Sequence, residues 1–330
     1  MADYCSPEGL IFGNSSYAEI MNTIVLPELA KKEEVHRLTT SDRKALYCVS
    51  YSVPDARGTV LIVHGFTENA LKYAELIHSL LANGYSVISY DQRGHGRSWR
   101  DPDITNASVT HVDRMDDYVS DLQLVIHSVM KSFSRPWFVF AHSMGGAVTS
   151  LALEKNEFPF AGAALCAPMI APNLSGIPAA VAKAICQAGI RIGKGKKYPF
   201  FMKPYAGPED FDTSNATDPF RFKWYDEIKF SHSEFQNSVP TYRWTLESIR
   251  VTSRILAPGE PEKISCPVIL YTAEKDGTVL PEPQEAFIHR VPRGKHEIVL
   301  QARHEIFRSE DAVLFPWWRS VLSFFDASAK

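Results

Sequence analysis

Residues 137–155 read WFVFAHSMGGAVTSLALEK, and this stretch decides the fold. Its first part, 137–143, is a short apolar run, which is typical of a buried strand. Its second part, 145–155, carries small and apolar residues at helical spacing. A sharp turn around Ser143 is all that separates the two. A buried strand that passes almost directly into a helix is the repeating unit of α/β proteins, so we expect that class here.

The same alternation continues on both sides of this stretch. Several of the strands are apolar throughout, which indicates a parallel sheet covered on both faces by helices. Residues 34–53 alternate enough to form two more strands around the turn Ser41-Asp42-Arg43. Further strands are predicted at 58–66, 85–91, 161–168, 267–276 and 296–305, and helices at 69–84, 112–133, 281–291 and 311–327.

The strand and helix rhythm stops after Pro168 and resumes at Pro267. Between them lies one helical pattern, at 178–190, followed by an irregular part rich in Phe, Tyr, Trp and Pro. We therefore predict an α/β fold with a mostly parallel sheet and one inserted subdomain. The expected division is an N-terminal extension at 1–33, a core at 34–170 and 263–330, and a cap at 171–262.

Composition excludes several classes of protein. The chain has 330 residues, of which 45% are hydrophobic, and a formal net charge of -3. Nucleic-acid binding needs a clustered basic excess, so we expect none. The five Cys are scattered without zinc-ligand spacing, so we expect reduced thiols, no metal and no cofactor. No signal peptide or membrane-spanning stretch is recognisable, which predicts a cytoplasmic protein.

Ser143 is the candidate nucleophile. It lies in Phe140-Ala141-His142-Ser143-Met144-Gly145-Gly146, between a strand and a helix, and such a strained turn exposes a serine hydroxyl at the end of the sheet. Residues that flank the serine must be small, because larger side chains would collide across the turn. The usual pattern is Gly-x-Ser-x-Gly, and Ala141 in the first position still meets this steric need.

A serine hydroxyl needs a base that removes its proton, and the base needs an acid that orients it. In folds that carry a nucleophile on such a strand-to-helix turn, the chain order is nucleophile, acid, histidine. His304 follows the last predicted strand and is the candidate base. Asp276 begins the loop after the preceding strand and is the candidate acid, with Glu274 as the weaker alternative. His289 and His296 fall within a predicted helix and at the start of a strand, so we interpret them as surface residues.

A tetrahedral intermediate carries an oxyanion, which needs preorganised N–H donors. The backbone N–H of Met144, directly after the serine, is the first candidate donor. The second is the N–H of Phe66, which follows His64 and Gly65 at the end of the strand at 58–66. Gly65 has no side chain, so the backbone can approach the site there.

Several segments together resemble the α/β-hydrolase superfamily, and more narrowly the bacterial lysophospholipases and monoacylglycerol lipases. They are HGFTENALKYAELI, YDQRGHGRS, AHSMGG, HVDRMDDYVSDL, PTYRWTLES and ARHEI, and they run from about residue 60 to the C-terminus. The resemblance implies a metal-free hydrolase with a mobile cap over an acyl pocket. It leaves the substrate open.

The aromatic content of the predicted cap favours a lipid or lipid-like ester as substrate. We expect Trp224, Tyr242 and Trp244 to line an apolar channel over Ser143, although such rings also pack caps onto sheets. A peripheral membrane contact through the cap is compatible with this interpretation. Two alternatives stay open: a general carboxylesterase for short-chain or aromatic esters, and a non-catalytic α/β-hydrolase binding protein. The sequence leaves the oligomeric state undetermined.

Overall fold

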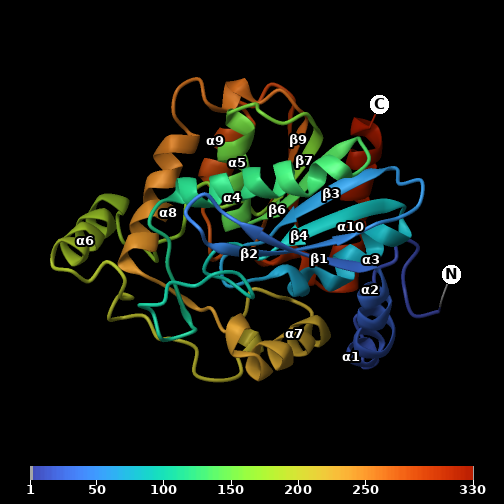
Figure 1. Ribbon diagram of the computed structural model, residues 1–330, viewed down its shortest axis with the longest axis horizontal. Helices are drawn as coiled ribbons and strands as arrows, with labels where there is room; N and C mark the ends of the chain where they lie inside the picture. The colour runs from blue at the N-terminus through green and yellow to red at the C-terminus, as the bar shows by residue number, and fades with distance from the viewer. Residues whose placement is uncertain (1–2, 330) are drawn as a thin grey trace.

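A sheet of eight strands runs through the centre of the computed structural model, which describes residues 3–329 (Figure 1). The strand order is β1-β2-β4-β3-β6-β7-β9-β10. Only β2 runs against the other strands, because it pairs antiparallel with both β1 and β4. The strands are β1 (Glu33–Thr39), β2 (Ala45–Tyr51), β3 (Gly58–Val63), β4 (Tyr85–Tyr90), β6 (Trp137–His142), β7 (Phe160–Cys166), β9 (Val268–Ala273) and β10 (Gly294–Val299).

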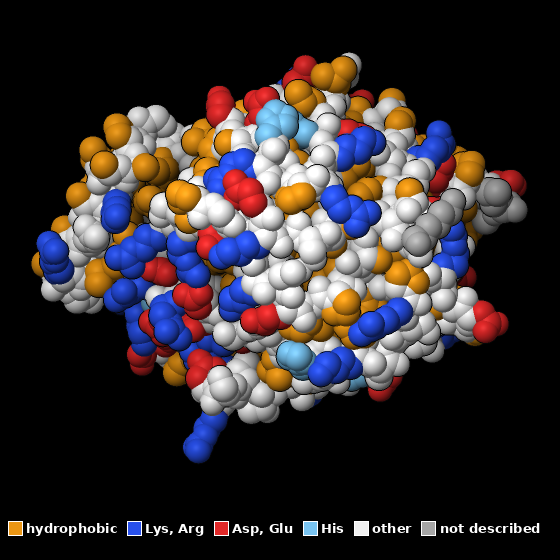
Figure 2. All heavy atoms as spheres, turned by 90° about the horizontal axis from the view of Figure 1, so that it is seen from above, with side chains coloured by type: hydrophobic (Ala, Val, Ile, Leu, Met, Phe, Trp, Pro, Cys, Tyr) orange, Lys and Arg blue, Asp and Glu red, His pale blue; other side chains and the backbone are white. Residues whose placement is uncertain are grey.

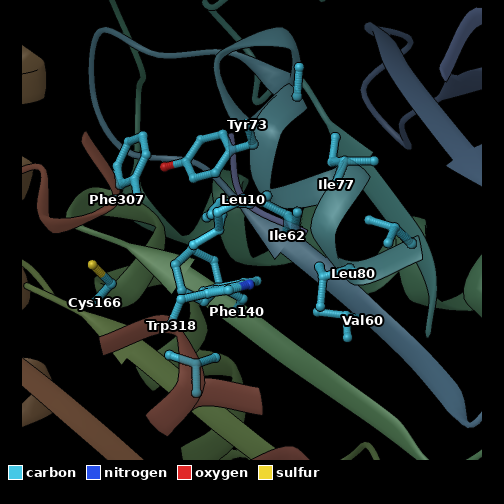
Figure 3. Close-up of a cluster of buried hydrophobic side chains, with 14 of the residues drawn as sticks. Leu10, Val60, Ile62, Tyr73, Ile77, Leu80, Phe140, Cys166, Phe307 and Trp318 are labelled. Carbon is cyan, nitrogen blue, oxygen red and sulfur yellow. The ribbon is translucent and has the colours of Figure 1, made fainter. Parts of the chain in front are cut away.

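Helices cover both faces of the sheet, and each face has its own hydrophobic core. Successive side chains of a strand point to opposite faces. On β3, Val60 and Ile62 therefore join the core under α3 (Ala74–Ala82) and α10 (Asp311–Ser328), as Figure 3 shows. Leu61 and Val63 join the opposite core, under α4 (Met115–Ser128), α5 (Met144–Glu154) and α9 (Pro281–Ile288). The central strands are buried on both faces, as their apolar sequence predicts.

The segment between β7 and β9 leaves the sheet and contains the remaining large helices. These are α6 (Ala179–Arg191), α7 (Pro219–Ser231) and α8 (Tyr242–Ile255). A short strand in this segment, β8 (Val239–Pro240), pairs with β5 (Val109–Thr110). Figure 1 shows α6 at one edge of the molecule, away from the sheet. Helix α8 packs against α4, α5 and α6, so it connects this segment to the core.

The N-terminal residues form ordered structure that the sequence does not reveal. Helices α1 (Tyr17–Ile20) and α2 (Leu26–Lys32) are joined by a π-helical stretch, Met21–Val25. This segment packs against α7 and α3, because its apolar residues belong to the same core as α3 and α10. Short 3₁₀ turns complete the structure at Ala70–Tyr73, Met130–Ser132, Phe211–Thr213, Ser233–Phe235, Pro261–Lys263 and Ile306–Arg308.

Candidate active site

Ser143 lies in a strained turn at the carboxyl end of β6. Its φ angle is +50°, a value that non-glycine residues rarely adopt, and α5 begins at the next residue. The backbone of the turn is fixed on both sides: the N–H of Ser143 donates to the carbonyl of Cys166, and its own carbonyl accepts from Met169. A Cβ atom at Gly145 would lie 2.2 Å from the carbonyl oxygen of Val63. The turn therefore requires glycine at that position.

The structure brings Ser143, His304 and Asp276 together from three separate loops. Nε2 of His304 lies 2.8 Å from Oγ of Ser143, and Nδ1 of His304 lies 2.7 Å from Oδ2 of Asp276. Glu274 is placed differently, because its carboxylate accepts a hydrogen bond from the backbone N–H of Gln301 at 2.7 Å. Of the two candidate acids, only Asp276 contacts the imidazole.

Asp276 is held in its charged form. Burial alone would raise the pKa of this carboxyl. The hydrogen bond and charge of His304, together with the backbone N–H groups of Val279 and Thr278, outweigh burial and lower the pKa below its usual value. These two N–H groups donate to Oδ1 at 3.0 and 2.8 Å, which leaves Oδ2 for the imidazole. A fixed carboxylate in this position selects the tautomer of His304 whose Nε2 accepts from Ser143.

The loop after β3 supplies the second expected donor for an oxyanion. The N–H of Gly65 is already engaged, because it donates to Oε2 of Glu68 at 2.5 Å. The next amide along the loop belongs to Phe66, and this residue lines the same cavity as Ser143. On the other side, Met144 is the first residue of α5, so its N–H has no partner within that helix. The two expected donors thus flank the serine.

A buried charge network lies behind these loops. Glu68 contacts His142, Lys72 and Tyr73, at 3.1, 3.4 and 2.6 Å respectively. Burial would raise the pKa of Glu68, but the charges of His142 and Lys72 hold it well below its usual value. Burial would likewise lower the pKa of His142, but Glu68 raises it above its usual value. The two side chains therefore form an ion pair.

The cavity over Ser143 has a volume of about 440 Å³ and a strongly charged lining. Five carboxylates and three cationic side chains contribute to it, and most of them are paired with one another. Lys72 bonds Glu305 at 2.6 Å, and Lys229 bonds Glu209 at 2.5 Å. Aromatic lining comes from Phe66, Phe222 and Tyr225. The charged residues of the lining are Glu68, Lys72, Glu209, Asp210, Asp226, Lys229, Glu305 and Arg308.

Comparison with known proteins agrees with this geometry. The family described as "Serine aminopeptidase, S33" matches residues 54–311, which is most of the chain. The chain belongs to this hydrolase family. Among curated relatives, "Probable lysophospholipase L2" of Haemophilus influenzae is 27% identical over 83% of this chain and 85% of that protein. "Lysophospholipase L2" of Escherichia coli K12 is 28% identical over 81% of this chain and 80% of that protein.

Solved structures share the fold of this hydrolase. The monoacylglycerol lipase of Paleococcus ferrophilus superposes with a TM-score of 0.67 at 21% identity, covering 86% of this chain and 99% of that one. The carboxyl esterase of Bacillus coagulans superposes with a TM-score of 0.70 at 17% identity, covering 90% and 99%. These matches identify the architecture as the α/β-hydrolase fold, which is the class that the sequence predicts.

The three aromatic residues expected to line the substrate channel lie elsewhere in this hydrolase. Trp224 packs on Tyr17 and donates to Asn22, so it joins α7 to the N-terminal segment. Tyr242 packs between α6 and α8. Trp244 is buried in the core on the α5 side and packs on Phe66 in a tilted arrangement, with ring centroids 4.3 Å apart. Within residues 3–329, none of the three lines the cavity over Ser143, so that prediction was wrong.

The expected apolar channel over Ser143 is replaced by two separate features. The cavity over Ser143 combines charged side chains with aromatic ones, whereas an apolar cavity of about 670 Å³ lies between residues 171–179, α8 and the start of α9. No pattern in the sequence indicated the charged lining. Glu68 and Lys72 are four residues apart, which suits one helical turn, but this spacing is equally common on solvated surfaces.

No group of three or more His, Cys, Asp or Glu side chains between residues 3 and 329 is arranged to hold a metal ion. Across the same residues, no helix combines the length and apolar character that a membrane span requires.

Proposed function

We propose that this chain is a serine carboxylic-ester hydrolase that cleaves acyl esters of lipids, of the lysophospholipase or monoacylglycerol lipase type. The observation that carries the proposal is the hydrogen-bonded series from Ser143 through His304 to Asp276, with spacings of 2.8 and 2.7 Å. The lysophospholipase names of the curated relatives support the choice of a lipid ester over a peptide.

The first half of the reaction forms an acyl-enzyme. Nε2 of His304 takes the proton of Ser143 as Oγ bonds to the ester carbonyl carbon. The carbonyl oxygen becomes an oxyanion, which the backbone N–H groups of Phe66 and Met144 stabilise. Asp276 stabilises the imidazolium that forms on His304. The intermediate then collapses, the bond to the alcohol oxygen breaks, and His304 returns the proton to the leaving alcohol.

The second half releases the fatty acid. A water molecule loses a proton to His304 while its oxygen bonds to the acyl carbon, and the same two N–H groups hold the second oxyanion. Collapse of this intermediate breaks the bond to Oγ, and His304 protonates Ser143. The carboxylic acid leaves and the serine is restored, so the reaction consumes one water and needs no other reactant.

We also propose that residues 171–262 act as a cap, with residues 1–33 as an extension of the core. Helix α7 lies in this segment, and it contributes Phe222, Tyr225, Asp226 and Lys229 to the wall of the cavity. A segment that closes over the site and holds the substrate head explains why the cavity is partly enclosed. Contact of this cap with a membrane surface belongs to the same proposal, because the substrate is a lipid.

A serine-directed label and a substrate panel test the proposal together. A fluorophosphonate probe should label the wild-type protein at Ser143 and leave Ser143→Ala unlabelled. The panel should contain a lysophospholipid, a monoacylglycerol, a short-chain ester, an aromatic ester and an aminoacyl peptide. Preference for the short-chain or aromatic ester would favour the general carboxylesterase. Absence of both labelling and turnover would favour a binding protein.

A further inference from the structure

The segment from Leu174 to Pro208 has an unusual charge composition. It contains six basic residues and no acidic residue, although the whole chain carries a formal net charge of -3. The segment includes α6 and the loop that follows it, and we call residues 177–203 the α6 lobe. Its basic residues are Lys183, Arg191, Lys194, Lys196, Lys197 and Lys203.

Few of these charges are neutralised by neighbours. Lys196 pairs with Asp101 and Asp103, at 3.0 and 2.5 Å. The other five take part in no ion pair with a described residue. All six side chains belong to exposed residues. The lobe therefore presents a local excess of positive charge to solvent.

The same lobe exposes large apolar side chains. Phe200 is 88% exposed, Ile192 is 68% exposed and Phe201 is 55% exposed. Val181 and Ile185 on α6 are exposed as well. Figure 2 shows orange and blue side chains gathered on the lobe that projects at its left edge, where Figure 1 places α6. Exposed apolar side chains that gather in this way mark interaction sites.

Helix α6 is amphipathic, and an exposed apolar stripe runs beside its buried face, about 90° around the helix. The inner face buries Ala182, Cys186 and Gly189, and α8 packs against it. Val181, Ile185 and Ile192, just past the end of the helix, fall within about 40° of one another at 100° per residue. Exposed apolar side chains combined with Lys and Arg on one surface are the pattern of segments that lie in a membrane interface, and here most of the basic residues follow the helix.

We propose that the α6 lobe is a docking surface for an anionic lipid bilayer. Phe200, Phe201 and the α6 stripe would enter the headgroup boundary, while the basic side chains pair with lipid phosphates. A second copy of this chain fits the lobe less well. A symmetric contact places the same patch on both partners, which would bring two positive lobes together.

The position of the lobe connects docking with the candidate active site. The chain leaves the lobe at Lys203 and within a few residues reaches Glu209, Asp210 and Ser214, which line the cavity over Ser143. Docking would therefore hold the cavity close to the surface from which a lipid leaves. The role of docking in supplying substrate rests on the proposed lipid hydrolysis, but binding to the bilayer itself requires no catalysis.

Vesicle flotation tests the proposal with the full chain. The probe is vesicles of ether-linked phosphatidylglycerol and phosphatidylcholine in equal amounts, with pure phosphatidylcholine for comparison. Wild-type protein and Ser143→Ala should both float with the anionic vesicles at low salt and be released at high salt, because salt screens surface charge. The variant Lys194→Glu/Lys197→Glu/Lys203→Glu should bind at least about a hundredfold more weakly, since each lost basic residue accounts for roughly fivefold.

Apolar insertion is tested separately. Phe200→Ser/Phe201→Ser should lower binding to anionic vesicles by at least about tenfold, because two buried aromatic side chains are lost. The matched control is Ile298→Ser/Leu300→Ser, which removes two comparably exposed apolar residues of the β10 region and should bind like wild type. The lobe variants and the β10 control, which all keep Ser143, should hydrolyse a water-soluble short-chain ester at the wild-type rate, since the lobe is separate from the reacting groups.

Three outcomes would overturn the proposal. The first is no binding of wild-type protein to anionic vesicles at low salt. The second is equal binding by the lobe variants and the control. The third is a dimer in analytical ultracentrifugation that Phe200→Ser/Phe201→Ser dissociates, which would assign the lobe to self-association. Because Ser143→Ala tests binding without turnover, these results stay distinguishable from a failure of the proposed activity.

Discussion

The carboxylate of Glu68 lies 3.1 Å from Nδ1 of His142, and both side chains are buried. The pair connects three parts of the candidate site. Glu68 also accepts from the N–H of Gly65, in the loop that leads to Phe66. Nε2 of His142 lies 3.1 Å from the carbonyl oxygen of His304. One ion pair therefore links the loop that carries Phe66, the turn before Ser143 and the loop that carries His304.

Removal of the Glu68 charge should disturb catalysis more than folding. Glu68→Gln keeps the shape of the side chain and an acceptor for Gly65, but it removes the partner charge of His142. We expect kcat to fall by about a hundredfold with little change in KM, because small misplacement of reacting groups costs about this much. Steady-state kinetics on a soluble ester measure kcat and KM, and circular dichroism checks that the variant is folded.

The matched control is Glu75→Gln, which removes another buried carboxylate that is paired with a cation, Arg221. It should lower thermal stability and leave kcat near the wild-type value. NMR titration of His142 supplies a second measurement, since loss of Glu68 should lower the pKa of this imidazole. If the pKa of His142 and kcat both stay at wild-type values in folded Glu68→Gln, the ion pair has no role in positioning the site.

The same network predicts how stability depends on pH. His142 has a raised pKa in the folded state, so its contribution is fully present below the unfolded value of about 6.5 and is lost as pH rises through the folded pKa. Glu68 and Glu305 have lowered pKa values, in the case of Glu305 about 2. Burial opposes this shift, but Lys72 and Arg308 outweigh it for Glu305.

These carboxylates contribute stability above a pH of about 4.3, and this is lost as pH falls toward their folded pKa values. Chemical denaturation between acid and alkaline pH should therefore show a maximum between the two regions. In His142→Gln the decline on the alkaline side should become shallower while the acid decline persists. An unchanged alkaline slope in this variant would show that His142 does not bind its extra proton in the folded state.

Neutralising Asp276 should lower kcat far more than neutralising Glu274. Asp276→Asn removes the charge that orients His304 and stabilises its protonated form, so kcat should fall by about 10⁴-fold. Glu274→Gln changes a side chain that only accepts from the backbone of Gln301, so we expect an effect within about tenfold. The reverse ranking in purified, folded variants would assign the acid to Glu274.

The sequence predicted the parts of the site that backbone topology determines. Ser143, Asp276 and His304 all lie at or just past the carboxyl ends of predicted strands, and the carboxyl ends of parallel strands meet at one edge of the sheet. Their chain order and strand positions were enough to anticipate that they meet. The sheet and its covering helices could be predicted for the same reason, because apolar strands alternate with amphipathic helices.

The walls of the cavity could not be predicted in this way. They come from side chains whose partners are far away in sequence, such as Lys72 and Glu305, or Glu68 and His142. Aromatic composition was also misleading, because Trp224 and Trp244 occur in a stretch predicted to be irregular but lie on α7 and α8 and pack into ordinary cores. Helices α1 and α2 have a weak apolar pattern and are stabilised by tertiary contacts with α3 and α7.

The two tryptophans should behave differently from each other when truncated, because they pack in different places. Trp224→Ala opens a cavity between α7 and the N-terminal segment, which should cost roughly 3–5 kcal/mol of unfolding free energy. Trp224 does not touch the cavity over Ser143, so kcat/KM should keep its dependence on acyl-chain length. Trp244→Ala should cost a similar amount of stability and also remove the ring against which Phe66 packs.

Loss of that ring should loosen the loop that carries the Phe66 amide, so Trp244→Ala should lower kcat by a similar factor for acetate, medium-chain and long-chain esters. Removal of one oxyanion donor costs about 10²-fold to 10³-fold, which sets the upper bound of this effect. The measurement is kcat/KM across a series of ester chain lengths, below the melting temperature of each variant. Selective loss of long-chain activity in either variant would show that the truncated tryptophan contacts the acyl chain. Loss of activity for all esters in Trp224→Ala, with its fold intact, would show that the N-terminal segment positions α7 for catalysis.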